Sequence, residues 1–392
     1  MEIICDAHLD LAINAVSFDR DLTLTLDEIN LAEKHLTDHP GRGRSTISLP
    51  EMRTGGVALA MATLLARAQG RARPSSGFMR VDFDHATKDA ASCTAAGQLA
   101  YYRLLESRNE MAMIESRGDL EDHIALWDVS RAPRDAESET EVEGNRARGI
   151  AEEQHGEGSG PGDKHPIGIV LSMEGSDSII DPSDCERWWR NGVRVASLVH
   201  YGSNDYAAGT GRDGPISDLG WRLLEEFERL GMILDLTHLS DQAMSQALEK
   251  FNGSLLATHS NCRELVSGQR QLTDDQIKLI AERGGMICVA LDAWMLYPGW
   301  IRGRTDTSLV SFREVANQIE HIVTLTGNAD CAGIGSDLDG GFGTEQTPGD
   351  CKSIADLQKL SSHLRDRGYT SQDTRKIMSG NLIGFLSRNL PK

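Results

Sequence analysis

Eight short hydrophobic segments recur along the chain, separated by polar loops and by patterns typical of amphipathic helices. The segments are EIICDAHL, GVALAMATLLA, IGIVLSMEG, RVASLVHYG, MILDLTHLS, SLLATHSN, GMICVAL and CAGIGSDLDG. Their nearly continuous apolar character, rich in Val, Ile and Leu, is typical of strands that are buried on both faces of a parallel sheet. We therefore expect eight parallel strands.

Helix signals lie between these segments. The stretch SDLGWRLLEEFERLG offers Ser217 or Asp218 as its N-cap and Gly231 as its end, and TDDQIKLIAERGG begins with a Thr273 cap. Alternation of eight strands with helices predicts an α/β fold, a (β/α)8 TIM barrel. An open doubly wound sheet is the alternative, and it is less favoured because no G-x-G-x-x-G pattern follows the first strand.

Two regions look like additions to this barrel. Residues 13–48 form a predicted polar loop between the first two strands, and residues 130–166 have almost no apolar side chains. A segment of that composition cannot bury a core face, so we expect a polar, mobile insertion at 130–166. The whole chain, 1–392, is then predicted to be one barrel domain carrying this insertion.

The charge and the cysteines narrow the class of protein. A formal net charge of -19 argues against binding to nucleic acid or to an anionic membrane surface, because both would repel the chain. Seven cysteines without C-x-x-C spacing suggest reduced thiols rather than a disulfide framework or a zinc knuckle. With neither an export signal nor a run of apolar residues long enough to span a bilayer, we expect a soluble cytoplasmic protein.

Candidate chemistry appears where the predicted strands end, the place where barrel active sites are built. In the first strand His8 and Asp10 project to one face, because alternate residues of a strand share a face. An isolated His-x-Asp pair is more often structural, and so is a lone histidine or aspartate at a strand end. Here, however, six of the eight strands supply such a group, which favours a functional site. These groups are His8, Asp10, Glu174, His200, His238, His259, Asp337 and Asp339.

Four imidazoles and several carboxylates, without a thiolate, suit Zn²⁺, Mn²⁺ or Fe²⁺ in a hydrolytic site. The ligands outnumber the needs of one ion, so two divalent ions bridged by Glu174 and a water fit the count. Two ions would lower the pKa of the bridging water and stabilise a developing oxyanion. Asp337 is the expected proton shuttle.

The same motifs resemble the membrane (renal) dipeptidase family, the M19 peptidases of the amidohydrolase superfamily. The matching stretches are DAHLDL, SMEG, GVRVASLVHYGSNDYAAG, GMILDLTHLS, ATHSNCRELVSGQRQLTDDQI and GIGSDLDG. They occur in the family order and extend from residue 6 to residue 340, so the resemblance covers nearly the whole chain apart from the polar insertion.

The resemblance implies a role for each matching residue. The metal ligands would be His8 and Asp10 for one zinc ion, Glu174 as the bridge, and His238 and His259 for the second. His200 would contact the substrate carbonyl, Arg270 would bind the substrate carboxylate, and Asp337 would be the general acid/base. Asp339 would be structural, and Asp235, Asn261 and Arg263 would help to order the site.

One departure from the family bears on specificity. Where the family usually has an Asn-Phe-Tyr-like stretch whose aromatic hydroxyl helps to hold the substrate carboxylate, this chain reads CVALDAWML and places Asp292 there. An acid beside Arg270 would repel a carboxylate or occupy its partner, so Asp292 is predicted to line the substrate site.

The leading prediction is a zinc-dependent dipeptidase that hydrolyses small dipeptides, with L,D-dipeptides as candidates, by a metal-bridging hydroxide. The alternative keeps the metal chemistry and takes an N-acyl amino acid, an amide or a lactone as substrate. A metal-free scaffold that kept only the barrel is disfavoured by the complete ligand set. Relatives often form dimers, so a homodimer is a further expectation.

Overall fold

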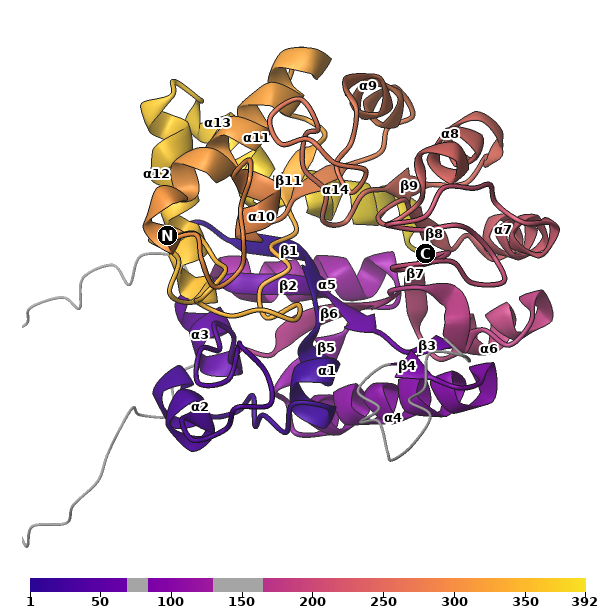
Figure 1. Ribbon diagram of the computed structural model, residues 1–392, viewed down its shortest axis with the longest axis horizontal. Coiled ribbons are helices and arrows are strands. Elements are labelled where there is room, and N and C mark those ends of the chain that lie inside the picture. Colours follow the sequence, from indigo (N-terminus) through magenta and orange to yellow (C-terminus); the bar gives the residue numbers. More distant parts are fainter. Residues whose placement is uncertain (69–83, 130–164) are drawn as a thin grey trace, which may run out of the picture.

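The computed structural model describes residues 1–68, 84–129 and 165–392. Eight parallel strands form the barrel, in the order β10-β11-β1-β2-β6-β7-β8-β9 (Figure 1). An isolated parallel bridge between Ala257, directly after β9, and Ile287 in β10 closes this sheet on itself. The predicted TIM barrel is confirmed. Its strands are β1 (Ile4–Leu9), β2 (Val57–Leu64), β6 (Ile167–Met173), β7 (Val193–Ser197), β8 (Ile233–Asp235), β9 (Leu255–Leu256), β10 (Ile287–Val289) and β11 (Ala332–Ile334).

Every residue of these eight strands is buried, because side chains point both into the barrel and outward against the helices. Cys5, Leu59 and Val170 belong to the inner cluster of apolar side chains, whereas Ile4 and Ala60 belong to the larger cluster between strands and helices. Burial on both faces explains why the strand sequences are continuously hydrophobic rather than alternating.

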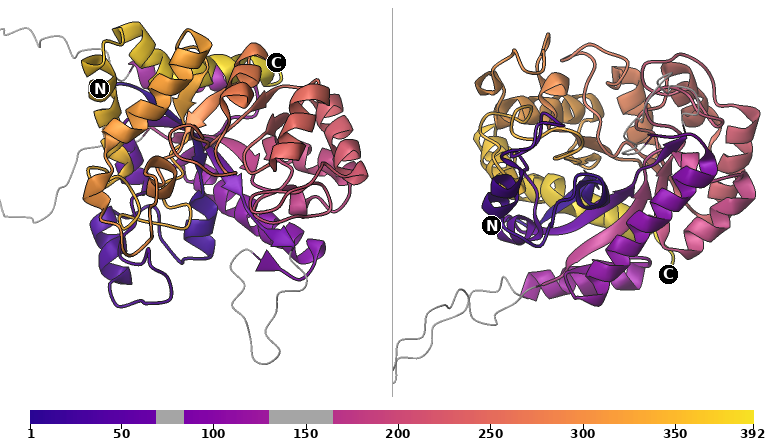
Figure 2. Two further views of the ribbon diagram at one scale, coloured as in Figure 1. Left: turned by 45° about the horizontal axis from the view of Figure 1, so that its top comes forward. Right: turned by 60° about the horizontal axis from the view of Figure 1, so that its bottom comes forward.

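Helices surround the strands in both further views (Figure 2). Two predicted helix boundaries are confirmed: Ser217 caps α7 by accepting from Gly220 N, and Gly231 ends it with a left-handed φ of 75°. Thr273 likewise caps α9 in a capping box with Gln276. The helices are α1 (Leu11–Val16), α2 (Leu26–Glu33), α3 (Leu49–Thr54), α4 (Lys88–Ser107), α5 (Arg117–Val129), α6 (Cys185–Arg190), α7 (Asp218–Leu230), α8 (Asp241–Lys250), α9 (Asp274–Glu282), α10 (Ala293–Leu296), α11 (Phe312–Thr326), α12 (Gln358–Asp366), α13 (Ser371–Arg375) and α14 (Asn381–Asn389).

The prediction of a loop over residues 13–48 is wrong, because α1 extends to Val16 and α2 occupies Leu26–Glu33. The sequence carried a signal for α2 that the polar composition masked. Thr25 and Glu28 form a capping box, the S/T-x-x-E pattern that begins many helices. Short strands outside the eightfold pattern also escaped prediction: β3 (Arg67–Ala68), β4 (Asp84–His85) and β5 (Met111–Met113).

Asp339 anchors the segment that follows β1 to the segment that follows β11. Its buried carboxylate accepts hydrogen bonds from the hydroxyls of Ser45 and Thr46 and forms an ion pair with Arg20 at 3.2 Å. The structural role expected for Asp339 is confirmed by these contacts.

The predicted insertion at 130–166 lies outside the described residues except for its last two positions. None of the helices in the described ranges has the length and apolar character needed to cross a bilayer.

Candidate metal centre and active site

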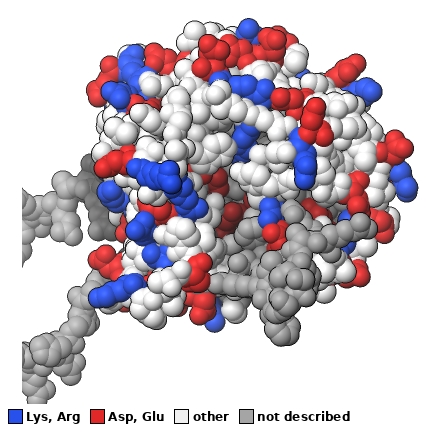
Figure 3. Space-filling model, viewed as in Figure 1, with Lys and Arg blue, Asp and Glu red and all other residues white. Residues whose placement is uncertain are grey.

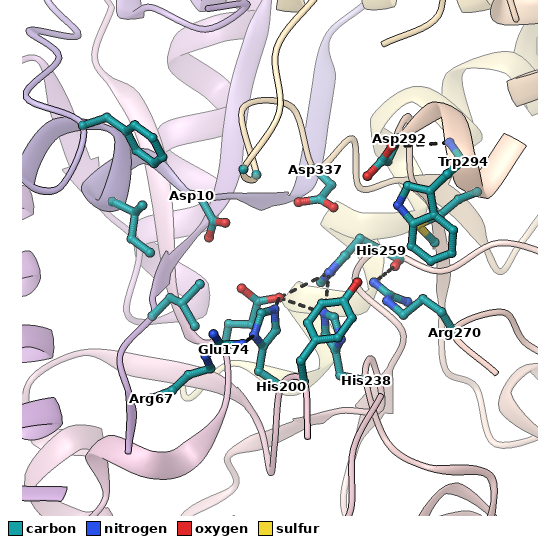
Figure 4. A pocket seen from close by; sticks show the side chains of 17 residues that line it. Asp10, Arg67, Glu174, His200, His238, His259, Arg270, Asp292, Trp294 and Asp337 are labelled. Carbon is teal, nitrogen blue, oxygen red and sulfur yellow. Dashed lines mark hydrogen bonds and ion pairs between the residues drawn. The ribbon is translucent and has the colours of Figure 1, made fainter. Parts of the chain in front are cut away.

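A cavity opens at the C-terminal ends of the barrel strands, and it gathers nearly all the residues expected to be functional (Figure 4). On the described part of the face shown in Figure 3, acidic and basic side chains are interspersed. The expected functional residues that line the cavity are Asp10, Glu174, His200, His238, His259, Arg270, Asp292 and Asp337. His8 is 1% exposed, and its Nε2 atom lies 3.7 Å from an oxygen of Glu174.

Glu174 is the centre of the cluster, since one of its carboxylate oxygens faces four imidazoles. Its Oε1 atom lies 3.1 Å from Nε2 of His238, 3.3 Å from His259, 3.5 Å from His200 and 3.7 Å from His8. These residues come from the ends of β1, β6, β7, β8 and β9. A carboxylate surrounded in this way is placed as a shared ligand of two neighbouring ions would be.

The second part of the cluster is formed by His8, Asp10 and Asp337. Nε2 of His8 lies 3.8 Å from an oxygen of Asp10 and 3.8 Å from an oxygen of Asp337. This nitrogen is buried and has no hydrogen-bond partner in the described ranges, whereas a buried polar atom of that kind normally has one. A metal ion would satisfy it. The Thr63 hydroxyl donates to Oδ1 of Asp10, the same oxygen that faces His8.

Threonine hydroxyls lie against Nδ1 of two of the four histidines that face Glu174. The Thr258 hydroxyl donates to Asp235 at 2.6 Å and therefore accepts from Nδ1 of His259 at 2.9 Å. Thr210 donates to the backbone carbonyl of His238 and lies 3.0 Å from Nδ1 of that ring. Both hydroxyls are able to accept from Nδ1–H, and in that tautomer Nε2 keeps its lone pair, which is the form that binds a metal ion.

Burial perturbs the titration of every group at the centre. Desolvation, followed by the charge of Arg270, lowers the pKa of His8 to about 3. Desolvation also raises the pKa of Asp10 to about 6 and holds the pKa of Glu174 well above its usual value. Neutral imidazoles lie beside carboxyls that resist ionisation even with the charge of Arg270 nearby, and further positive charge would stabilise their ionised form. The donor set therefore fits divalent cations, which would supply that charge.

Backbone strain is concentrated at the same place. His238 has a φ of 71° and Asp337 a φ of 58°, both in the left-handed region. Non-glycine residues rarely adopt this conformation, and it persists where the surrounding structure imposes it. At both positions it directs a side chain toward the cavity (Figure 4).

Arg270 and Asp292 both line the cavity but do not pair with each other among the described residues. Arg270 donates to the Ser260 hydroxyl at 3.2 Å and to the His259 carbonyl at 2.7 Å. Asp292 accepts from the Gln346 amide at 3.1 Å, and burial raises its pKa to about 7. Arg270 therefore keeps its charge available for a ligand, and the effect of Asp292 on a substrate carboxylate stays a prediction.

Sequence reasoning missed the threonines that contact the histidines but found part of the support behind them. Of those expected to order the site, Asp235 supports His259 through Thr258, and Asn261 ties its loop to the carbonyls of Ala290 and Met295. Arg263 instead forms an ion pair with Asp241 at 2.6 Å, away from the ligands. Thr258 directly precedes His259, so this pair of neighbouring residues could have indicated the support in the sequence.

Arg67 was also missed, and it lies against His200. Its Nη1 atom is 3.0 Å from Nδ1 of His200. The two residues are 133 positions apart, so no local pattern in the sequence joins them.

The chain belongs to the membrane dipeptidase family, peptidase family M19, whose family model matches residues 161–388, more than half of the chain. Among curated proteins it is 28% identical over 245 residues to dipeptidase aclJ of Aspergillus oryzae, which covers 61% of this chain and 55% of that protein. It is 26% identical over 225 residues to an uncharacterised dipeptidase of Schizosaccharomyces pombe, covering 56% of this chain and 53% of that one. The chain thus spans about half the length of the curated relatives it matches.

Solved structures share the fold. A metallopeptidase from Rhodobacter sphaeroides, solved with a phosphinate mimic of the dipeptide L-Ala-D-Ala, matches with a TM-score of 0.71 at 20% identity, covering 99% of this chain and 100% of that one. The probable dipeptidase PvdM from Pseudomonas aeruginosa matches with a TM-score of 0.69 at 18% identity, covering 98% of this chain and 95% of that one.

Proposed function

We propose that the protein is a dipeptidase that depends on two divalent metal ions, with zinc as the native metal. The observation that carries the proposal is the position of Glu174 Oε1, within 3.7 Å of four imidazole nitrogens. Family membership adds weight, because peptidase chemistry needs a water activated for attack on an amide.

In this proposal His8, Asp10 and Glu174 hold one ion, and Glu174, His238 and His259 hold the other. The two ions would lower the pKa of a water between them and polarise the scissile carbonyl. This set of imidazoles and carboxylates also accepts Mn²⁺ and Fe²⁺, so the choice of zinc is a separate step of the proposal.

The remaining residues position the substrate and move protons. Arg270, a buried cation without a carboxylate partner among the described residues, binds the C-terminal carboxylate of the dipeptide. His200 donates a hydrogen bond to the scissile carbonyl, where negative charge develops. Asp337 lies 3.8 Å from His8, and burial holds its pKa well above the usual value, which suits a carboxyl that takes up and returns a proton.

The cavity favours a small substrate. It measures about 210 Å³, less than the roughly 300–1,000 Å³ of sites for drug-sized ligands. A similar fold has been solved with a mimic of L-Ala-D-Ala, so we propose L,D-dipeptides among the substrates of this chain as well.

Asp292 supports a second candidate with the same metal chemistry. Its carboxyl lines the cavity together with Arg270 and Trp294. When ionised it would oppose a substrate carboxylate, which favours an N-acyl amino acid, an amide or a lactone whose charge lies elsewhere.

The proposal also covers the cellular compartment and the oligomeric state. All seven cysteines lie in described parts of the chain and none is joined in a disulfide, which suits a reducing compartment such as the cytoplasm. A homodimer, expected from the resemblance, completes the proposal.

The test is steady-state hydrolysis of L,L-dipeptides, L,D-dipeptides and N-acyl amino acids by protein reloaded with Zn²⁺, Mn²⁺ or Fe²⁺, with the chelated protein as control. Chelator-sensitive cleavage of dipeptides supports the first candidate. Cleavage of N-acyl amino acids alone supports the second, and no metal-dependent hydrolysis of any of them would contradict both.

A further inference from the structure

Distance alone does not decide which imidazoles beside Glu174 are metal ligands. Nε2 of His200 lies 3.5 Å from Glu174 Oε1, close to the 3.1 Å and 3.3 Å of His238 and His259. Glu174, His200 and His238 even form a group spaced as metal ligands are. The partner of the other ring nitrogen, Nδ1, is what separates His200 from its neighbours.

In His259 that partner is the Thr258 hydroxyl, which gives its proton to Asp235, so it accepts from Nδ1–H and leaves Nε2 with its lone pair. In His238 the partner is the Thr210 hydroxyl, a group that is able to accept from Nδ1–H. In His200 the partner is Nη1 of Arg67 at 3.0 Å. A guanidinium carries only donors and stays protonated. Nδ1 of His200 must therefore accept, and the proton of the neutral ring resides on Nε2, the atom that faces the cavity.

We infer that Arg67 is a positioning residue that holds His200 in its Nε2–H form, so that His200 donates to the substrate carbonyl and stays out of the metal ligand set. The inference rests on the proposed function for the identity of that carbonyl. It gives two chemically different roles to three histidines that are similarly placed around one carboxylate.

Arg67 is itself held in place from two sides. Asp84 accepts from its Nε at 2.6 Å and from its Nη2 at 2.7 Å, and the two residues are paired in the β3–β4 ladder. The adjacent Ala68 N donates to Asp177 at 3.1 Å, and Asn204 donates to the same carboxylate at 2.9 Å. The fork with Asp84 fixes the guanidinium, and the hydrogen bond to Asp177 fixes the backbone beside it, with Nη1 directed toward His200.

The fork with Asp84 also argues against a direct role in binding substrate. It occupies the pair of parallel N–H groups, Nε and Nη2, with which an arginine grips a carboxylate. Arg67 differs in this from Arg270, which has no carboxylate partner among the described residues.

The kinetic test compares Arg67→Met with Arg67→Lys in wild-type and His200→Ala backgrounds. Removing a donor aimed at developing charge costs roughly 100- to 1,000-fold in kcat. Because Arg67→Met misorients that donor rather than deleting it, we expect kcat to fall about 10- to 100-fold, with KM changed less than about threefold. Arg67→Lys, which keeps a donor and the charge, should recover part of the loss.

In the His200→Ala background, Arg67→Met should cost less than about twofold more, because the ring through which it acts is gone. The matched control is Arg187→Met, since Arg187 forks Asp184 at 2.6 Å and 2.8 Å in the same way but lies on α6, away from the cavity. An equal loss in both backgrounds, or a raised KM with unchanged kcat, would overturn the inference.

A second measurement needs neither metal nor substrate. Two-bond ¹H–¹⁵N correlations of ¹⁵N-histidine-labelled, chelated protein distinguish Nε2–H from Nδ1–H rings, and the His200→Ala spectrum identifies the signal. We expect the Nε2–H form for His200 and its loss in Arg67→Met; an Nδ1–H ring in the wild type would refute the inference. If metal-loaded wild type hydrolyses no dipeptide, the proposed function fails, and this spectrum still decides between the two forms of His200.

Discussion

The Asp292 carboxyl should make the stability of the metal-free protein depend on pH, and Asp292→Asn should remove that dependence. The side chain is 6% exposed, and burial is the main cause that raises its pKa from 3.8 to about 7. The amide of asparagine can keep both existing contacts, because it still accepts from Trp294 N while Gln346 turns its own carbonyl toward it.

The sign and the size follow from linkage. A carboxyl with a raised folded-state pKa binds its proton more tightly in the folded protein, so stability is greatest below pH 4 and declines as pH rises to about 7. A shift from 3.8 to about 7, at 1.36 kcal/mol per pKa unit, corresponds to about 4 kcal/mol in total, of which about 2.5 kcal/mol falls between pH 5 and pH 8.

The assay is urea unfolding of chelated wild type and Asp292→Asn at pH 5 and pH 8. From pH 5 to pH 8 the free energy of unfolding should fall by about 2.5 kcal/mol more in the wild type than in the variant. Asp122→Asn, at an exposed position of α5, is the matched control and should run parallel to the wild type. If Asp292→Asn shows the same change in unfolding free energy as the wild type, the carboxyl is not buried as a neutral group and the reasoning is refuted.

Three further substitutions test other parts of the structure. Glu174→Gln should weaken metal binding by more than about 100-fold, seen as less than one bound ion per chain after dialysis; two retained ions would contradict the bridging role. Arg270→Met should lower kcat/KM for dipeptides by about 30- to 1,000-fold, equivalent to roughly 2–4 kcal/mol, whereas equal losses on carboxylate-free dipeptide amides would argue against carboxylate binding. Gly335→Ala should destabilise the protein by about 3 kcal/mol in urea unfolding, because its Cβ would lie 1.7 Å from the Thr258 carbonyl oxygen. Gly97→Ala is the control, since it lies in α4 with nothing within 4 Å of the new Cβ, and it should raise the stability by up to about 1 kcal/mol. Similar effects of the two substitutions would show that the close approach of Gly335 to the Thr258 carbonyl does not limit stability.

The barrel was predictable because its determinants are local. Continuous Val, Ile and Leu runs specify buried parallel strands, and caps such as Thr273 mark where helices begin. The rim residues were predictable for a related reason, since a ligand at the end of each strand is fixed by the strand itself. The loop assigned to 13–48 failed because average polarity was weighed above the local capping signal of Thr25 and Glu28.

What the sequence could not supply is contact between distant segments. Arg67 reaches His200 across 133 positions, and Asp339 is held by Ser45 across 294. The protonation of each histidine depends on such contacts rather than on its own motif. The left-handed backbone of His238 was also out of reach, because tertiary structure imposes it on a residue that does not favour it.

The central claim is that this cluster binds two divalent ions which the reaction needs. The most direct measurement titrates Zn²⁺ into chelated protein while dipeptide hydrolysis and bound metal are followed in the same samples. The account predicts that two ions bind per chain and that full activity appears only as the second site fills. Full hydrolysis by the metal-free protein, or no binding of metal at the cluster, would contradict it.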